Sequence, residues 1–316
     1  MSEDKLRRQL YDAFANRAHI YHLLFCQLRS EIGAEKAAER FGAAPEYSAL
    51  LGDVANIVAG GLGPEARAEL YDPATRSFSP TGSMRTARAF QTATLLQSGK
   101  VLLVGGEATD GSSLATAELY DPGTGSFSPT GNTLTGRRWH SATLLQNGKV
   151  LIAGGASDSS VLASAELFDP STGQFTPTGS MLSARSGHTA TLLMDGHVLV
   201  AGGSEPGTSA ELYDPKSGSF MATGSMAAEH NGHSATLLLN GRVLLAGGVH
   251  PPGSTKAELF DPAGGGVFVP AGTMELPRAG PTGTLLSDGR VLVTEGCSAA
   301  TADGCTQALA TAELYP

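Results

Sequence analysis

Basic side chains are scarce in this sequence, and so are cysteine, tryptophan and long apolar runs. The 316 residues carry 21 basic and 30 acidic side chains, a net charge of −9. Affinity for the phosphate backbone of nucleic acids comes largely from Lys and Arg, so this balance argues against a nucleic-acid partner. No stretch of about 18 apolar residues occurs, so we expect no membrane-spanning helix.

The three cysteines, Cys26, Cys297 and Cys305, are too few for a disulfide-rich scaffold. Cys297 and Cys305 flank a short Ala- and Gly-containing stretch, and a disulfide between them is geometrically plausible across a hairpin. In a reducing cytosol both would stay thiols. The N-terminus mixes charges throughout and lacks the apolar region and cleavage site of a secretory signal, so we expect a cytoplasmic protein.

Glycine is abundant, with 41 residues, and much of it falls in a regular pattern. Glycine doublets recur every 45–49 residues, at 60–61, 105–106, 154–155, 202–203 and 247–248, and a degraded copy, Glu295-Gly296, follows. A period of this length indicates a repeat architecture in which each repeat buries its apolar face against its neighbours. The six repeats span about 47–84, 85–134, 135–182, 183–226, 227–275 and 276–316.

Each repeat is typical of four short antiparallel strands. Strand one is a TATLL or SATLL run, such as Ala93–Leu96 and Ala142–Leu145, and strand two is the VLLVGG-like run that ends in the doublet. Pairs such as Asn147-Gly148 separate them and predict type I′ hairpin turns, which need positive φ at both central residues. Strand three is AELY or AELF, an Asp-Pro turn follows, and strand four carries one phenylalanine.

The combination of doublet, turn and aromatic residue resembles the kelch-repeat β-propeller, in the bacterial form where AELYDP follows the doublet. The resemblance covers residues 47–316 and implies an all-β fold of about six four-stranded blades. Phe stands where many kelch repeats place Trp. The first repeat has a poor strand one, and the last ends at AELYP without a fourth strand, so one blade is expected to be three-stranded or completed by N-terminal residues.

A short α-helical extension is predicted before the propeller. Apolar residues at spacings of three, four and seven indicate a helix over 3–30, and 34–41 form a second, short helix. This stretch resembles the N-terminal helices of L-2-amino-thiazoline-4-carboxylic acid hydrolase-like proteins, from which no catalytic residue is carried over. We therefore expect a helical segment at 1–45 and a propeller at 46–316. The helices could dock on the propeller, mediate self-association or lie on a membrane surface.

Recognition is expected on the strand ends that carry the doublets, because the loops there differ in length between repeats. The residues before strand one lie at the same ends of the strands and supply hydrogen-bond donors and aromatic side chains. Two interpretations are open for the Arg and His residues: structural bonds to loop carbonyls and acidic groups of the adjacent blade, or a rosette of ligand-binding donors. The candidate binding residues are Phe90, Arg137, Trp139, His140, Arg185, His188, His230 and His233.

Two aromatic residues of this set break the pattern shared by the other repeats. Phe90 and Trp139 occupy a position that is Gly187, Gly232 or Gly280 in the other copies. Aromatic residues dominate binding hot spots and stack on sugars, so this pair is the best contact candidate. The alternative is that both plug the channel of the propeller.

The sequence favours a non-catalytic binding or scaffold protein with a protein or glycan partner. The alternative is a carbohydrate-active propeller enzyme, by resemblance to galactose oxidase. That resemblance implies copper held by two His, a Tyr and a Tyr–Cys crosslink, and no cysteine here is placed for it. We expect no catalytic residue, metal or cofactor.

Overall fold

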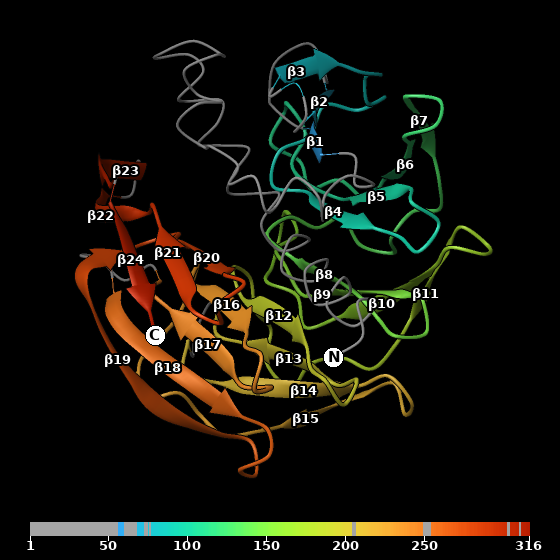
Figure 1. The fold of residues 1–316 in the computed structure, drawn as a ribbon. Coiled ribbons are helices and arrows are strands. Elements are labelled where there is room, and N and C mark those ends of the chain that lie inside the picture. The colour runs from blue at the N-terminus through green and yellow to red at the C-terminus, as the bar shows by residue number, and fades with distance from the viewer. Residues whose placement is uncertain are drawn as a thin grey trace. The chain divides into compact units, whose positions relative to one another are not determined.

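The computed structural model describes residues 56–59, 68–72, 75, 77–203, 207–248, 254–301, 304–309 and 311–316. Every regular element within these residues is a β-strand, as Figure 1 shows, which confirms the all-β expectation for this part of the chain. The helices predicted at 3–30 and 34–41, and the predicted boundary at 45/46, lie outside the described residues. Within them, no helix is long and apolar enough to cross a membrane.

The strands form antiparallel sheets that follow the repeats in order. Among the residues that the structure describes, four sheets have four strands and two have three, and a separate two-stranded hairpin lies within the last repeat. The sheets and their strands are β1 (Asn56–Ala59), β2 (Ala68–Asp72) and β3 (Ser77–Pro80); β4 (Thr92–Leu95), β5 (Val101–Val104), β6 (Ala117–Asp121) and β7 (Ser126–Pro129); β8 (Ser141–Leu144), β9 (Val150–Ala153), β10 (Ala165–Asp169) and β11 (Gln174–Pro177); β12 (Thr189–Leu192), β13 (Val198–Ala201), β14 (Ala210–Asp214) and β15 (Ser219–Ala222); β16 (Ser234–Leu237), β17 (Val243–Ala246), β18 (Ser254–Asp261) and β19 (Val267–Arg278); β20 (Thr282–Leu285), β21 (Val291–Thr294) and β24 (Ala312–Tyr315); and the hairpin β22 (Cys297–Thr301) with β23 (Gly304–Ala308).

The chain divides into two compact units, which are described separately below. Unit 1 comprises 1–138 and 170–175, and unit 2 comprises 139–169 and 176–316. Within unit 2 the first strands of successive repeats, β8, β12, β16 and β20, lie next to one another in that order. Such a row of antiparallel sheets, which contact one another through their first strands, is the arrangement expected within a propeller.

The hairpin turns between strands one and two differ from the prediction. In the turn after β8, the Gly148 N–H donates to the Leu145 carbonyl and the Leu145 N–H to the Lys149 carbonyl, at 3.0 and 2.8 Å. Gly148 has a φ of 83°, and Asn147 does not share its positive φ. The turn is therefore type I followed by a left-handed glycine bulge, and the type I′ prediction was wrong. The Asn147 side chain accepts the Lys149 N–H at 3.0 Å, which fixes this turn.

Backbone hydrogen bonds link each repeat to the next. In unit 2 the second glycine of each doublet donates its N–H to the carbonyl of the Arg or His that opens the following repeat. The bonds are Gly155 to Arg185 (2.9 Å), Gly203 to His230 (2.8 Å) and Gly248 to Arg278 (2.8 Å). In unit 1, Gly106 donates to Arg137 in the same way at 2.8 Å. The doublet is thus conformationally required, and it also joins neighbouring sheets.

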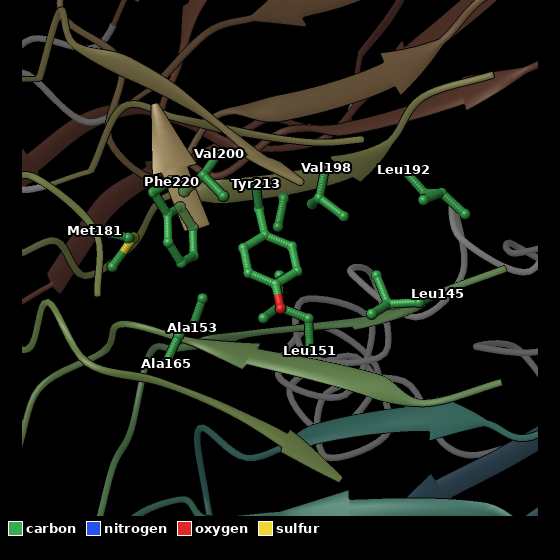
Figure 2. Packing of buried hydrophobic residues seen from close by; sticks show 11 residues of the cluster. Leu145, Leu151, Ala153, Ala165, Met181, Leu192, Val198, Val200, Tyr213 and Phe220 are labelled. Carbon is green, nitrogen blue, oxygen red and sulfur yellow. The ribbon is translucent and has the colours of Figure 1, made fainter. Parts of the chain in front are cut away.

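The hydrophobic core lies between successive sheets. Figure 2 shows one such cluster in unit 2, where Leu151 of β9 packs with Val198, Val200 and Tyr213 of the next sheet. Phe220 of β15 stacks on Tyr213 with ring centroids 4.8 Å apart, so the aromatic residue of strand four covers that of strand three. The same Tyr–Phe or Phe–Phe pairing is found in three other sheets: Tyr71–Phe78, Tyr120–Phe127 and Phe260–Phe268.

Candidate functional site

The arginine before strand one braces its own repeat from the inside. The Arg185 guanidinium donates to the carbonyls of Gly202 (2.8 Å) and Ser209 (3.0 Å). It also bonds Ser209 Oγ (3.1 Å) and forms an ion pair with Glu211 (2.7 Å). Arg185 is fully buried, so it ties the ends of strands two and three to the start of strand one. Arg88 and Arg278 make the same set of bonds with Gly105, Thr116 and Glu118, and with Glu295, Thr311 and Glu313.

These bonds correct the expected partner of the arginines. The acidic group belongs to the same repeat as the arginine, as in the pairs Arg88–Glu118, Arg185–Glu211 and Arg278–Glu313, so the expected partner in an adjacent blade was wrong. Glu211 also accepts the backbone N–H groups of Leu182 (2.7 Å) and Ser183 (3.1 Å), which belong to the link from the preceding repeat. One buried carboxylate therefore pairs with the arginine and also fixes the incoming chain through charge-assisted hydrogen bonds.

His230 stands where the other repeats carry this arginine. Its Nδ1 lies 2.7 Å from the Gly247 carbonyl and its Nε2 lies 3.2 Å from the Glu258 carboxylate. Both ring nitrogens thus lie within hydrogen-bond distance of an oxygen atom of the same repeat. His230 is fully buried, and so is Arg137. The described structure therefore does not present Arg137, Arg185 or His230 as donors on the surface.

The second set of histidines connects neighbouring sheets in unit 2. His188 Nε2 lies 2.9 Å from Ser141 Oγ at the start of β8, and His233 Nε2 lies 2.9 Å from Thr189 Oγ1 at the start of β12. Burial and the Arg185 charge lower the pKa of His188 to about 3. Burial, and to a lesser extent the neighbouring His230 and His188 rings, hold the pKa of His233 well below its usual range. These rings are neutral structural links, and His140 is also buried.

The aromatic residues Phe90 and Trp139 differ from these buried Arg and His residues in backbone conformation and in exposure. Trp139 has a φ of 53° and Phe90 a φ of 58°, both in the left-handed region that favours glycine. Gly187, Gly232 and Gly280 occupy the same place in later repeats, with φ of 66°, 60° and 65°. Trp139 is 40% exposed, whereas Phe90, in unit 1, is partly buried.

Backbone hydrogen bonds connect these positions in unit 2 into what we call the collar, defined as Trp139, Gly187, Gly232 and Gly280. The Gly280 N–H donates to Gly232 (3.0 Å), Gly232 to Gly187 (2.8 Å) and Gly187 to the Trp139 carbonyl (3.1 Å). The loop after the last doublet lies beside it, because Ala279 and Cys297 exchange backbone bonds of 2.9 and 2.8 Å. Trp139 is therefore the exposed aromatic end of a row of glycines, and the other end of the row lies beside a variable loop.

A carboxyl group that the sequence reasoning missed lies near the same end of the strands. Glu295 replaces the first glycine of the last doublet and has a φ of 64°. Burial raises the pKa of Glu295, and the nearby Thr282 hydroxyl opposes that shift only in part. The signal was visible as the break in the glycine doublet, which we interpreted only as degradation of the repeat.

Two further features belong to the variable loops. Cys297 is disulfide-bonded, but the Cys305 side chain lies outside what the structure describes, so their pairing stays a prediction. In unit 1, Arg138 forms an ion pair with Glu107 (2.6 Å) and donates to the Gly111 carbonyl (2.8 Å). This pair ties the segment before strand one to the loop after the doublet.

Comparison with known proteins bears on the fold. No family model and no curated protein matches this chain. Among solved structures, a fungal alcohol oxidase of the AA5 family in complex with copper has a TM-score of 0.66 at 17% identity, over 82% of this chain and 58% of the oxidase. The structure of YjhT has a TM-score of 0.61 at 17% identity, over 80% of this chain and 90% of YjhT. With the succession of antiparallel sheets, these likenesses support a β-propeller fold.

The chain spans less than two thirds of the oxidase, and the described residues do not fit that protein's copper. Within the described ranges no three His, Cys, Asp or Glu side chains gather in a group that could hold a metal ion. His188 and His233 each use one ring nitrogen on a hydroxyl of the neighbouring sheet.

Proposed function

We propose that this protein is a kelch-type β-propeller that acts as a non-catalytic recognition module. It binds a protein or glycan partner through the strand ends that carry the collar and the variable loops. The recurring doublet, AELY strand and Asp-Pro turn support the kelch type, and the differing loop lengths support recognition at this end. The proposal includes neither a cofactor nor a nucleic-acid partner.

The left-handed, exposed Trp139 carries the proposal. A non-glycine residue in this conformation costs roughly 1–2 kcal/mol relative to the ordinary region. Backbone strain of this kind concentrates at binding and catalytic sites. The other collar positions avoid the cost by using glycine. Retaining a large aromatic side chain here, 40% exposed, fits a contact with a partner better than it fits packing.

A second candidate function is an enzyme that acts on carbohydrate, and Glu295 is the observation that favours it. A carboxyl whose pKa is raised by burial can serve as a general acid. Glycoside hydrolysis usually needs a second carboxylate nearby, and no charged group contributes to the shift at Glu295. Stoichiometric copper in the purified protein, or turnover of a sugar substrate, would favour the enzyme over the recognition module.

Trp139→Ala tests the recognition function. Immobilised full-length protein should capture a partner from cell lysate or bind glycans on an array, and Trp139→Ala should abolish this while unfolding remains cooperative. The matched control is Leu239→Ala, which removes a side chain of similar exposure (43%) at the hairpin-turn end of the strands. Unchanged capture by Trp139→Ala would contradict the proposal, and so would equal losses in both variants.

Location and assembly are also proposals. We propose a cytoplasmic protein that can self-associate through its N-terminal helices. A disulfide at Cys297 that persists in protein isolated from cells would contradict the cytoplasmic location, because cytosolic thiols are normally kept reduced. Mass measurement of protein isolated under alkylating conditions decides the redox state, and sedimentation of the chain with and without residues 1–45 tests the self-association.

A further inference from the structure

The last sheet of unit 2 differs from the two before it in its outermost strand. In the sheets β12–β15 and β16–β19 the third strand lies between the second strand and a fourth. In the sheet β20–β21–β24, as far as the structure describes it, the third strand β24 is the edge. An edge strand presents a row of backbone N–H and C=O groups that can pair with a further extended segment. The four-stranded sheets show what such a segment contacts.

The register of a four-stranded sheet shows which backbone groups of β24 face outward. The Ala210 carbonyl of β14 accepts the N–H of Thr223, which directly follows the fourth strand β15, at 3.2 Å. Ala312 has the same place in β24, and alternate residues of a strand bond to opposite neighbours. The Ala312 carbonyl and the Leu314 N–H therefore point away from β21, and no described residue hydrogen-bonds to either group.

The aromatic side chain of β24 is also less covered than its counterparts. Phe220 of β15 stacks on Tyr213, which is fully buried. Tyr315 has the same register in β24 but is only partly buried, and no described aromatic ring stacks on it. The side chain of Glu313 is 21% exposed, against 3% for Glu211. An added strand with an aromatic residue would cover Tyr315 as Phe220 covers Tyr213.

The preceding sheet offers a second contact for the added segment. Gly179 and Gly224 follow the fourth strands β11 and β15. Each donates its N–H, at 2.8 Å, to a glycine carbonyl in the turn that leads into the fourth strand of the next sheet, Gly218 or Gly266. Gly272 of β19 has the same place in its repeat, and no described atom lies within 4 Å of a Cβ added to it. A turn that enters beside β24 would supply this contact.

The sequence of the fourth strands gives the chemistry of the added segment. Each reads Phe-x-Pro or Phe-x-Ala, then Thr or Ala, then Gly, in copies that begin at Phe78, Phe127, Phe175, Phe220 and Phe268. All five copies belong to strands that are paired within their own sheets. The strand-three signature Ala-Glu-Leu occurs six times, and no sixth copy of the strand-four signature is present in the 316 residues.

We propose that the outer edge of β24 binds an extended segment of a partner protein, which pairs antiparallel with it and places an aromatic residue on Tyr315. The partner supplies the strand because the chain has no sixth copy of the signature. Val267 and Val269 of β19 alternate with the inward-packed Phe268 and are 44% and 39% exposed, so they add apolar surface towards the last sheet. This interface is separate from the collar and does not depend on the proposed recognition function.

The test measures binding of a fluorescent peptide to the full-length protein by anisotropy. The probe has the sequence of residues 121–131, Asp-Pro-Gly-Thr-Gly-Ser-Phe-Ser-Pro-Thr-Gly, which contains a turn and a fourth strand. We expect saturable binding at one peptide per chain. Methylation of the backbone nitrogen at Ser128 should weaken binding about 10-fold or more, because that N–H faces strand three. The matched control is methylation at Phe127, whose N–H faces away, and it should bind as the unmodified peptide does.

Variants of the protein locate the peptide. Tyr315→Ala should weaken binding about 3- to 10-fold through the lost ring contact. Tyr315→Phe keeps the ring, as Phe260 does in β18, and should bind normally. Trp139→Ala should also bind the peptide normally, so failure of this interface and failure of the collar are distinguishable. Equal binding of the two methylated peptides, no saturable binding, or equal affinity of Tyr315→Ala would overturn the proposal.

Hydrogen exchange of the Leu314 amide separates a partner from other occupants of the edge. In the free full-length protein this amide should exchange rapidly, and the peptide should slow it about 10-fold or more at saturation. Protection in the free protein at every concentration would mean that the same chain covers the edge. Protection that rises with protein concentration would mean that a second copy does. Either result would overturn the proposal of a partner strand.

Discussion

The two ends of the strands follow different rules. At the hairpin-turn end, the left-handed positions are all glycine: Gly99, Gly148, Gly196, Gly241 and Gly289. At the collar end, the described residues contain three left-handed positions that are not glycine, namely Phe90, Trp139 and Glu295. The backbone requirement is the same at both ends, so the difference lies in the side chains retained despite the strain. Strain that the fold itself avoids elsewhere marks these three positions as functional candidates.

The largest effect is expected from removing the buried brace that underlies the collar end. Arg185→Ala leaves the Glu211 carboxylate and the Gly202 and Ser209 carbonyls without their donor, and loss of one partner of a buried ion pair costs about 3–5 kcal/mol. Urea unfolding measures the loss.

The control for this prediction is Lys149→Ala. Lys149 pairs with Asp169 at 3.1 Å, but the pair is exposed, so its removal should change stability by about 1 kcal/mol at most. Similar losses in Arg185→Ala and Lys149→Ala would show that the buried brace is not what holds the collar end.

A smaller loss of stability is expected from substituting two glycines with positive φ. Comparing them separates the cost of steric overlap from the cost of backbone strain. Gly202→Ala places a Cβ 2.1 Å from the His230 carbonyl and should cost more than about 3 kcal/mol, from steric overlap added to strain. Gly280 has nearly the same φ as Gly202, but a Cβ added there would have nothing within 4 Å. Gly280→Ala should therefore cost only about 1–2 kcal/mol. Thermal unfolding of both variants gives the difference. Equal costs would mean that the doublet glycine is required by its φ alone.

A pH dependence of the unfolding free energy is expected from the buried histidines. The folded pKa of His188 is about 3 and its ordinary value is 6.5, so between these values the unfolded chain binds more protons. The stability that the neutral ring contributes is complete above pH 6.5 and is lost as the pH falls towards 3. His188→Gln keeps a partner for Ser141 and should flatten the fall in unfolding free energy over this window. An unchanged slope would show that the ring is not held neutral.

The repeated features were predictable because each is seen several times in register. The AELY strand, the doublet and the Asx-Gly turn position all recur, and the structure places strands where the pattern indicates, with strand one shifted by one residue. The turn type was not predictable, because Asn147-Gly148 fits two hairpin geometries that differ in the φ of Asn147.

Other misses came from interactions that a sequence pattern does not display. The brace of Arg185 depends on residues that converge from three strands, so nothing in the sequence distinguished a buried donor from an exposed one. Glu295 was passed over because a break in a repeat was interpreted as decay. Trp139, by contrast, was found from the same kind of break, since an aromatic residue in place of glycine suggests a contact more readily than an acid does.

The collar bonds have a consequence for how ligand preference can change. Gly187, Gly232 and Gly280 each commit their N–H group to the preceding collar carbonyl. A ligand therefore finds no free main-chain N–H donor at these three positions and must be recognised by side chains. Because the main chain there is fixed independently of the guest, an exchange of one side chain can alter selectivity while the scaffold beneath remains as it was.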